Sequence, residues 1–264
     1  LFRSEIQIAE ACDYVLHCAS NTHPKSYASD PIGTIMTNIA GTQHILDYAV
    51  KANSEKVLFL STVEIYGENR GDLDKFTEDY CGYIDCNTLR AGYPEGKRAS
   101  ESLCQAYIQK YGIDVVIPRI SRTFGPTMLL SDSKASSQFI MNAVHKENIV
   151  LKSAGTQLYS YAYVADIVSA LLFLLVKGQK GEAYNVSNEH CDITLRTFAE
   201  TLANVAGTKV IHGEATAQEK QGFSKATKAL LDNQKIYALG WRPLYDSMEE
   251  PLKHTIKILE GSGN

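Results

Sequence analysis

Apolar residues follow two patterns that alternate along the first half of the chain. Continuous apolar runs at Tyr14–Cys18, Lys56–Leu60 and Val115–Ile120 predict buried strands. Between these runs, apolar residues recur at three- and four-residue intervals, which predicts helices at Thr34–Lys51 and Pro94–Tyr111. Strands that alternate with helices are typical of an α/β fold, so we expect a doubly wound, largely parallel sheet with helices on both faces.

The alternation becomes less regular after Gly125, where strands and helices no longer follow in turn. The elements predicted there are a strand near Ile149–Lys152 and helices near Ser136–Lys146, at Val164–Val176, at Leu195–Ala206 and after Leu239–Pro243. This change of pattern predicts a second, smaller α+β domain. The first domain is expected to cover residues 1–126 and 158–190, and the second residues 127–157 and 191–264.

Charge and composition argue against two classes of protein. The formal net charge is -4, the pI is near 6.0, and no dense stripe of lysine and arginine occurs, all of which disfavour a nucleic-acid binder. The longest apolar run, Ile167–Val176, is interrupted by Ser169 and is much shorter than the roughly 20 residues of a membrane span. We therefore expect neither nucleic acid nor a membrane as a partner.

The six cysteines show neither a C-x-x-C pair nor the paired histidine spacing of a structural zinc site. We therefore predict no metal site. Reduced, mostly buried thiols are usual in cytosolic proteins, so this cysteine usage predicts a cytoplasmic protein.

Tyr93 and Lys97 stand four residues apart at the start of a predicted helix, within a Y-x-x-x-K motif. This spacing places the two side chains on one face of the helix, a turn apart. A nearby ammonium favours the phenolate, so we expect Lys97 to lower the pKa of Tyr93 and to make it a usable base. Such pairs also arise often by chance, so the value of the motif depends on its surroundings.

Small and polar residues stand where the predicted strands end. They are Ala19 and Ser20 after the first strand, Ser61, Thr62 and Glu64 after the second, and Ile120, Arg122 and Thr123 at the end of the third. In open α/β sheets, ligands bind at this carboxyl edge. Small residues at the edge would let a flat cofactor approach the backbone.

Taken in order along the chain, these motifs resemble those of the extended short-chain dehydrogenase/reductases, also called the epimerase/dehydratase family. Further segments that carry the resemblance are Thr37–Thr42, Tyr163–Asp166, Tyr184–Val186 and Leu239–Pro243. Within the family, the chain looks most like the UDP-glucuronate decarboxylases, or UDP-xylose synthases. The segments that carry this likeness are Arg90–Arg98, Glu101, Cys104–Tyr107, Thr77–Tyr80 and Thr123–Pro126.

The resemblance implies a Rossmann-type domain that binds NAD, a smaller domain that binds a nucleotide sugar with UDP as the expected carrier, and a homodimer formed through the helices after Thr34 and Tyr93. It implies that Tyr93 is the catalytic base, that Lys97 holds the ribose and tunes Tyr93, and that Thr62 bonds a sugar hydroxyl. Glu64 occupies the acidic position of the family's active site. The implied chemistry passes through a transient 4-keto sugar.

The resemblance also defines two sets of expected binding residues. The cofactor set comprises Ala19, Ser20, Ser61, Tyr93, Lys97 and Ile120. The substrate set comprises His23, Glu64, Arg122, Thr123, Tyr159 and Lys228.

Three positions depart from the family's patterns. Tyr159 stands where the decarboxylases carry an arginine that contacts substrate, and Arg122 stands where they carry an asparagine. Because the loss of a bidentate guanidinium contact is not conservative, decarboxylation is the leading hypothesis and 4-epimerisation stays open. Val63 replaces the aspartate of the sugar dehydratases, which makes dehydration a weaker alternative. The rival of another class is an inactive domain that only binds a nucleotide sugar or a partner.

The sequence contains no G-x-x-G-x-x-G turn, whose helix N-terminus holds the cofactor's diphosphate in this family. The first recognisable strand, Asp13–Cys18, matches the family's fourth. We therefore expect an N-terminally incomplete Rossmann domain that lacks about 60 residues, taking about 30 for each of two βαβ units. We also expect weak or absent NAD binding by this chain alone.

Overall fold

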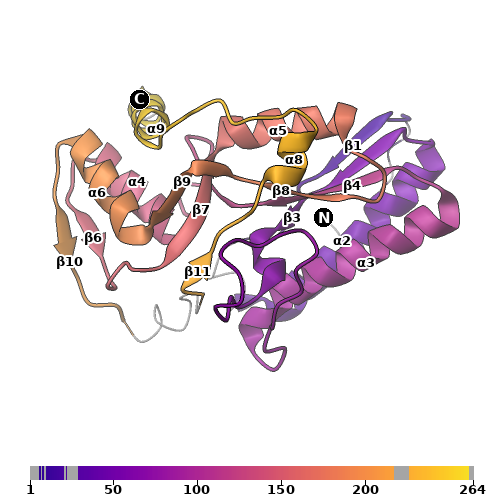
Figure 1. Cartoon of the computed structure of the whole chain (residues 1–264), viewed down its shortest axis with the longest axis horizontal. Coiled ribbons are helices and arrows are strands. Elements are labelled where there is room, and N and C mark those ends of the chain that lie inside the picture. The colour runs from indigo at the N-terminus through magenta and orange to yellow at the C-terminus, as the bar shows by residue number, and fades with distance from the viewer. Residues whose placement is uncertain are drawn as a thin grey trace.

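The computed structural model describes residues 6, 8, 10–20, 22, 29–216 and 226–261, which form two lobes side by side (Figure 1). The first lobe is built on a sheet of β1 (Tyr14–His17), β2 (Lys56–Phe59), β3 (Ser61–Thr62), β4 (Val115–Ile120) and β8 (Ala183–Val186). Neighbours run in the order β1-β2-β4, and β4 also pairs with β3 and β8. Every one of these pairs is parallel, so the carboxyl ends of the strands lie at one edge.

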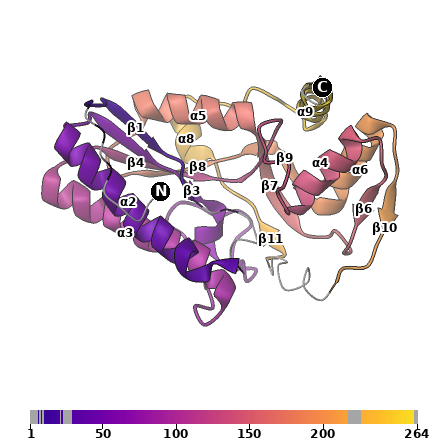
Figure 2. The same cartoon turned by 180° about the vertical axis from the view of Figure 1, so that it is seen from behind.

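Two helices, α2 (Pro31–Ala52) and α3 (Gly92–Tyr111), pack against each other on one face of this sheet (Figure 2). The carboxylate of Asp30 accepts from Gly33 N at 2.9 Å and thereby caps the start of α2. Gly112 ends α3 with a φ of 74°, which lets the chain turn out of the helix. The core beneath these helices includes Leu46, Val57, Phe59, Val115 and Ile117.

The helices α5 (Val164–Lys177) and α8 (Gln234–Ala238) cover the opposite face of the sheet (Figure 1). Successive strand residues point to opposite faces, so alternate residues of β2 and β4 belong to this second core. It includes Leu58, Val116, Ile167, Leu171 and Leu174. Because helices cover both faces of a parallel sheet, the predicted doubly wound α/β fold is confirmed.

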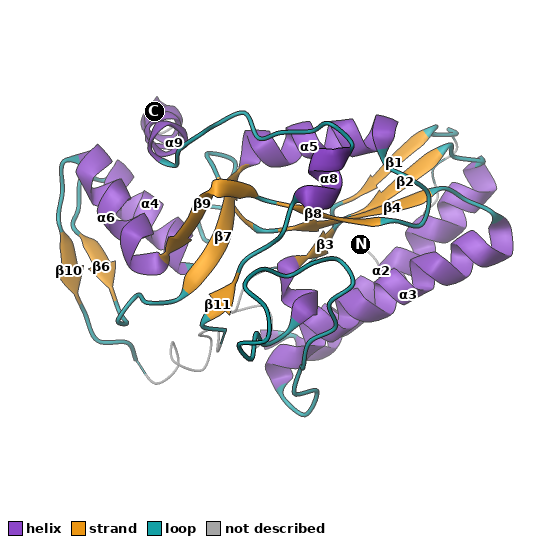
Figure 3. Cartoon of the chain, in the orientation of Figure 1, coloured by secondary structure: helices purple, strands orange, loops and turns teal. Residues whose placement is uncertain are grey.

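The second lobe contains a mixed sheet of β5 (Arg122–Phe124), β7 (Leu158–Tyr163), β9 (Asn188–Thr194) and β11 (Lys228–Ala229) (Figure 3). β7 is the central strand, because it pairs in parallel with β5 and β11 and antiparallel with β9. The remaining elements of this lobe are β6 (Ile149–Leu151), β10 (Val210–His212), α4 (Ala135–Val144), α6 (Leu195–Ala206) and α9 (Glu249–Gly261).

Elements predicted from periodicity are present in both lobes, among them α2, α3, α4, α5, α6 and β6. The structure differs from expectation within residues 158–190, because β7 pairs in the second sheet while α5 and β8 pack with the first. α8 also packs with the first sheet, although it lies within residues 191–264. The chain therefore crosses between the lobes more often than hydrophobic periodicity alone predicts.

Asn185 on β8 ties distant segments of the chain together. Its buried side chain donates to Phe76 O at 2.8 Å and to Asp232 O at 3.0 Å, and it accepts from Tyr66 Oη at 2.6 Å. Phe76 and Leu231 also form a parallel bridge. The loop at residues 67–88 and the segment before α8 are thus both held against the first sheet.

Candidate active site

Tyr93 and Lys97 occupy the first turns of α3 and are 7% and 2% exposed. Lys97 Nζ donates to Leu60 O at 2.7 Å and lies 4.8 Å from the centre of the Phe59 ring. The side chain of Tyr93 is hydrogen-bonded to that of Thr62. The structure therefore brings the Y-x-x-x-K pair to the carboxyl ends of β2 and β3, beside the predicted hydroxyl.

Burial controls the charges of this group. It raises the pKa of Tyr93 above its ordinary range, while the Thr62 hydrogen bond lowers that pKa and the Glu64 carboxylate raises it. Burial also lowers the pKa of Lys97 to about 8. The expected lowering of the Tyr93 pKa is not met, because burial dominates and the Lys97 ammonium is bonded to the Leu60 carbonyl. Tyr93 is therefore a neutral phenol at neutral pH.

A short 3-10 turn, η1 (Val63–Tyr66), sets the position of Glu64. Thr62 caps this turn, because its Oγ1 accepts from Glu64 N at 3.3 Å. The turn leaves the Glu64 carboxylate near enough for its charge to act on the pKa of Tyr93. Thr62, Glu64 and Tyr93 thus form one polar group at the end of β3.

The Glu64 carboxylate joins two arginines from different parts of the chain, and we call Glu64, Arg90 and Arg122 the Glu64 cluster. Arg90, in the 3-10 turn η2 (Leu89–Ala91), donates Nη2 to Oε2 at 3.0 Å. Arg122, on β5, donates Nη2 to Oε1 at 3.2 Å. No role was predicted for Arg90, although its place three residues before Tyr93 was a sign of proximity to the site.

Ser61 belongs to a different polar group. Its Oγ donates to Glu101 Oε1 at 2.5 Å, and Glu101 accepts from Arg119 through Nε at 3.1 Å and Nη2 at 2.7 Å. The remaining nitrogen of Arg119 donates to Tyr66 Oη at 3.0 Å and to Glu78 O at 2.6 Å. We call Glu101 and Arg119 the Glu101 pair. Among the residues that the structure describes, the Ser61 hydroxyl therefore bonds to this pair and not to the group formed by Thr62, Glu64 and Tyr93.

The other predicted cofactor residues lie at strand ends. Ala19, Ser20 and Ile120 are half-buried, and Ser20 Oγ donates to Asn38 Oδ1 at 2.8 Å. An ammonium carries three N–H donors. Among the described residues, the hydrogen bond of Lys97 Nζ goes to Leu60 O and uses one of these donors. A buried ammonium with donors to spare, at the same edge of the sheet as these half-buried residues, fits the hydroxyls of a cofactor ribose.

Three predicted substrate residues lie together, because Arg122 bonds Glu64 and its guanidinium stacks on the Tyr159 ring at 3.6 Å. The other two that the structure describes bond partners outside this group. Thr123 is exposed and donates to Ser121 O at 3.3 Å, whereas Lys228 forms an ion pair with Asp74 at 2.8 Å. Tyr159 is 6% exposed, and its hydroxyl donates to Ala226 O at 2.8 Å. His23 lies outside the described residues.

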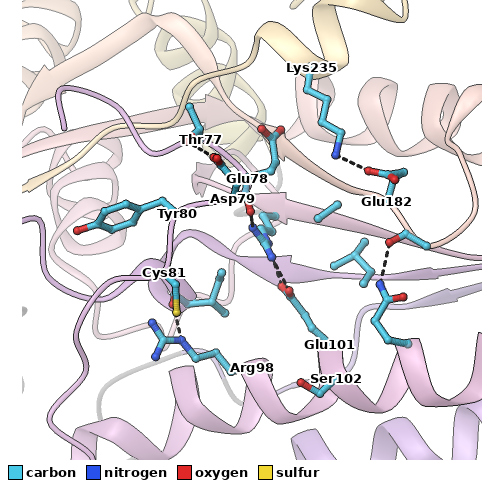
Figure 4. A pocket seen from close by; sticks show the side chains of 16 residues that line it. Thr77, Glu78, Asp79, Tyr80, Cys81, Arg98, Glu101, Ser102, Glu182 and Lys235 are labelled. Carbon is cyan, nitrogen blue, oxygen red and sulfur yellow. Dashed lines mark hydrogen bonds and ion pairs between the residues drawn. The ribbon is translucent and has the colours of Figure 1, made fainter. Parts of the chain in front are cut away.

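A cavity of about 720 Å³ opens beside α3, and neither Tyr93 nor Lys97 lines it (Figure 4). Its charged walls are largely paired with one another, as in the Lys235–Glu182 contact at 2.7 Å and the Glu101 pair (Figure 4). Over the described ranges, no group of three or more His, Cys, Asp or Glu side chains could hold a metal ion.

Comparison with known proteins shows which sequences this chain resembles. The model of the NAD dependent epimerase/dehydratase family matches residues 3–187. UDP-glucuronic acid decarboxylase 1 of Xenopus tropicalis is 32% identical over 258 residues, which are 96% of this chain and 59% of that protein. UDP-glucuronic acid decarboxylase 6 of Arabidopsis thaliana is 32% identical over 88% of this chain and 65% of its own length. The chain thus spans about three-fifths of the length of these curated relatives.

Solved structures share the fold. The UDP-glucose 4-epimerase of Thermotoga maritima, solved with UDP-glucose, matches with a TM-score of 0.82 at 23% identity, over 96% of this chain and 78% of that one. The dTDP-glucose 4,6-dehydratase of Streptomyces venezuelae, solved with NAD, matches with a TM-score of 0.79 at 25% identity, over 94% of this chain and 73% of that one.

Proposed function

Because the chain belongs to the NAD dependent epimerase/dehydratase family, we propose that it alters a nucleotide-linked sugar through a transient 4-keto sugar, most like a UDP-glucuronate decarboxylase. The observation that carries the proposal is the grouping of Thr62, Tyr93 and Lys97 at the carboxyl edge of the first sheet. The curated relatives named above are decarboxylases of UDP-glucuronic acid, which supports UDP as the carrier and a uronic acid as the sugar.

In this proposal Tyr93 exchanges a proton with the sugar C4 hydroxyl, and Thr62 orients that hydroxyl through the hydrogen bond that it shares with Tyr93. Lys97 holds the nicotinamide ribose with its spare donors, beside Ala19, Ser20 and Ile120. NAD, when bound, accepts and returns the hydride and adds a positive charge that favours the phenolate of Tyr93. A ketone at C4 makes a uronic acid a β-keto acid, which loses carbon dioxide.

Decarboxylation is favoured over dehydration by two features of the site. Val63, at the position of the dehydratases' aspartate, is 4% exposed and packs in the core of the second lobe. Two arginines hydrogen-bond the Glu64 carboxylate, one to each oxygen, so both oxygens already have partners within the protein. Epimerisation at C4 remains the alternative, because it needs the same tyrosine and the same hydride transfer.

We further propose a cytoplasmic homodimer. All six cysteines are unpaired, as in a reducing compartment. The expectation that most of them are buried is wrong, because only Cys104 and Cys191 are buried. α2 carries Ile32 and Met36 with exposures of 76% and 50%, and Leu89, just before α3, is 70% exposed. Apolar side chains at one end of a helix pair favour association with a second copy. Among the described helices, none is long and apolar enough to cross a membrane.

Incubation with UDP-glucuronate and NAD tests the function, with released carbon dioxide and the sugar product both measured. We expect UDP-xylose and carbon dioxide from the wild type when NAD is supplied at a concentration high enough to offset the weak cofactor binding expected of this chain. Tyr93→Phe should lower turnover by roughly 10²- to 10⁴-fold, the usual contribution of a general acid or base, while the melting temperature stays nearly unchanged. A product that keeps its carboxylate would favour the epimerase, and normal turnover by Tyr93→Phe would refute the assignment.

A further inference from the structure

The Glu64 cluster carries an unbalanced positive charge. It contains two guanidinium groups and one carboxylate, and the side chains of Arg90, Arg122 and Glu64 are 30%, 22% and 27% exposed. Within the described part of the chain, Nη1 of Arg122 is buried and has no hydrogen-bond partner. A cation with an unused donor is suited to an anionic ligand.

Tyr159 fixes the place of the Arg122 guanidinium. Arg122 on β5 is the register partner of Tyr161 on β7, and Tyr159 lies two residues earlier on the same face of that strand. The guanidinium leans back over the Tyr159 ring, 3.6 Å from its centre. The ring itself is held at its far end by the hydrogen bond to Ala226 O. A stacked guanidinium loses little freedom when it binds a ligand, because its orientation is already set.

The cluster lies between the lobes and beside the catalytic group. Arg122 comes from the second sheet, whereas Glu64 and Arg90 come from turns of the first lobe. Glu64, which bonds both arginines, also acts on the pKa of Tyr93 through its charge, so the cluster begins beside the reacting hydroxyl.

We propose that Arg122 is the residue through which this chain recognises an anionic group of its nucleotide sugar, and that Tyr159 and Glu64 are positioning residues that hold its guanidinium. The inference rests on the proposed function and names the chemistry of one subsite within it. Paired oxygens of a carboxylate or of a phosphate fit this donor set equally well. The uronic carboxylate and the diphosphate are therefore the two sources to be separated by experiment.

Calorimetric titration of the 264-residue chain with UDP, UDP-glucose and UDP-glucuronate tests the proposal. Arg122→Asn should weaken binding by roughly tenfold to hundredfold, the usual effect of losing a charged hydrogen-bond donor. An equal loss for all three ligands would identify the diphosphate as the partner. A loss confined to UDP-glucuronate would identify the carboxylate, and both outcomes support Arg122.

Three further variants separate recognition from folding. The double variant Arg122→Asn with Tyr159→Arg moves the guanidinium from β5 to β7 and should regain part of the lost affinity, whereas a packing defect would be made worse by it. Tyr159→Phe keeps the aromatic ring and should bind nearly normally. Tyr159→Leu removes the ring on which the Arg122 guanidinium stacks and should weaken binding several-fold.

Arg70 provides a matched control, because it lies over the Tyr83 ring at 4.2 Å beside Glu68 but has a side chain that is 60% exposed. Arg70→Asn should leave all three affinities unchanged. Unchanged affinities in Arg122→Asn, or a wild-type chain that binds none of the three ligands, would overturn the inference. A wild type that binds UDP-glucuronate in an Arg122-dependent way but forms no product would instead refute the proposed function alone.

Discussion

The molecule contains two arginine–carboxylate groups that differ in how completely their hydrogen bonds are made. In the Glu101 pair the side chains are 12% and 13% exposed, the contact is bidentate, and the remaining arginine nitrogen bonds Tyr66 and the Glu78 carbonyl. In the Glu64 cluster the side chains are about twice as exposed, and one arginine nitrogen has no partner among the described residues. The Glu101 pair is electrically balanced, whereas the cluster has one positive charge in excess.

The difference separates a structural role from a binding role. A buried pair whose donors and acceptors are all used has nothing to offer a ligand, and it contributes by holding α3 against β4. A partly exposed group with surplus charge gains from a ligand that brings the missing anion. Both groups are charged. They differ in whether every hydrogen-bond donor of the arginine has a partner within the protein.

The largest expected effect follows from breaking the Glu101 pair. Arg119→Met leaves Glu101 buried without its partner, which typically costs about 3–5 kcal/mol of unfolding free energy. Urea denaturation followed by circular dichroism measures this loss. Arg70→Met is the exposed control and should change stability by less than about 0.5 kcal/mol. A similarly small effect at Arg119 would mean that the pair is not structural.

Lys97 sharpens the comparison, because it is more deeply buried than the Glu101 pair but has donors to spare. Burial lowers its pKa from 10.5 to about 8, so the unfolded chain binds more protons between these values. The free energy of unfolding should therefore rise with pH from about 8 towards 10, by a few kcal/mol at most at about 1.4 kcal/mol per pKa unit. Lys97→Met should lack this rise. Parallel slopes for both proteins in urea titrations at several pH values would contradict the assigned burial.

The smallest expected effect on stability is at Glu64. Partly exposed ion pairs contribute about 0–1 kcal/mol, so Glu64→Gln should unfold at nearly the wild-type urea concentration. Its affinity for UDP-glucuronate should nonetheless change several-fold, since the glutamine no longer fixes the two guanidinium groups by charge. A large loss of stability without any change in affinity would assign Glu64 to the structural class.

Local patterns predicted the first lobe well because its elements are decided by neighbours in sequence. The run at Val115–Ile120 and the helical spacing from Thr34 onwards are visible in a short window, and both became elements of the first sheet and its covering helices. The Y-x-x-x-K spacing likewise placed Tyr93 and Lys97 on one helical face. These features need no knowledge of distant contacts.

Long-range contacts account for what the sequence did not predict. The stacking of Arg122 on Tyr159 depends on the pairing of β5 with β7, and the Arg90–Glu64 contact depends on two turns 26 residues apart. The predicted direction of the Tyr93 pKa shift was wrong for the same reason. Helical spacing showed the nearby ammonium but not the burial of the phenol, which raises the pKa. Side-chain partners of this kind follow from the assembled fold.

The buried amide of Asn185 has a consequence for local opening. One side chain bonds Tyr66, Phe76 and Asp232, so the loop that carries Phe76 cannot leave the sheet without also releasing the segment before α8. Segments linked in this way open as one cooperative unit. The amide of Phe76, which donates to Leu230 O at 2.8 Å, should therefore exchange its hydrogen with solvent as slowly as the amides of β8, although it lies in a surface loop.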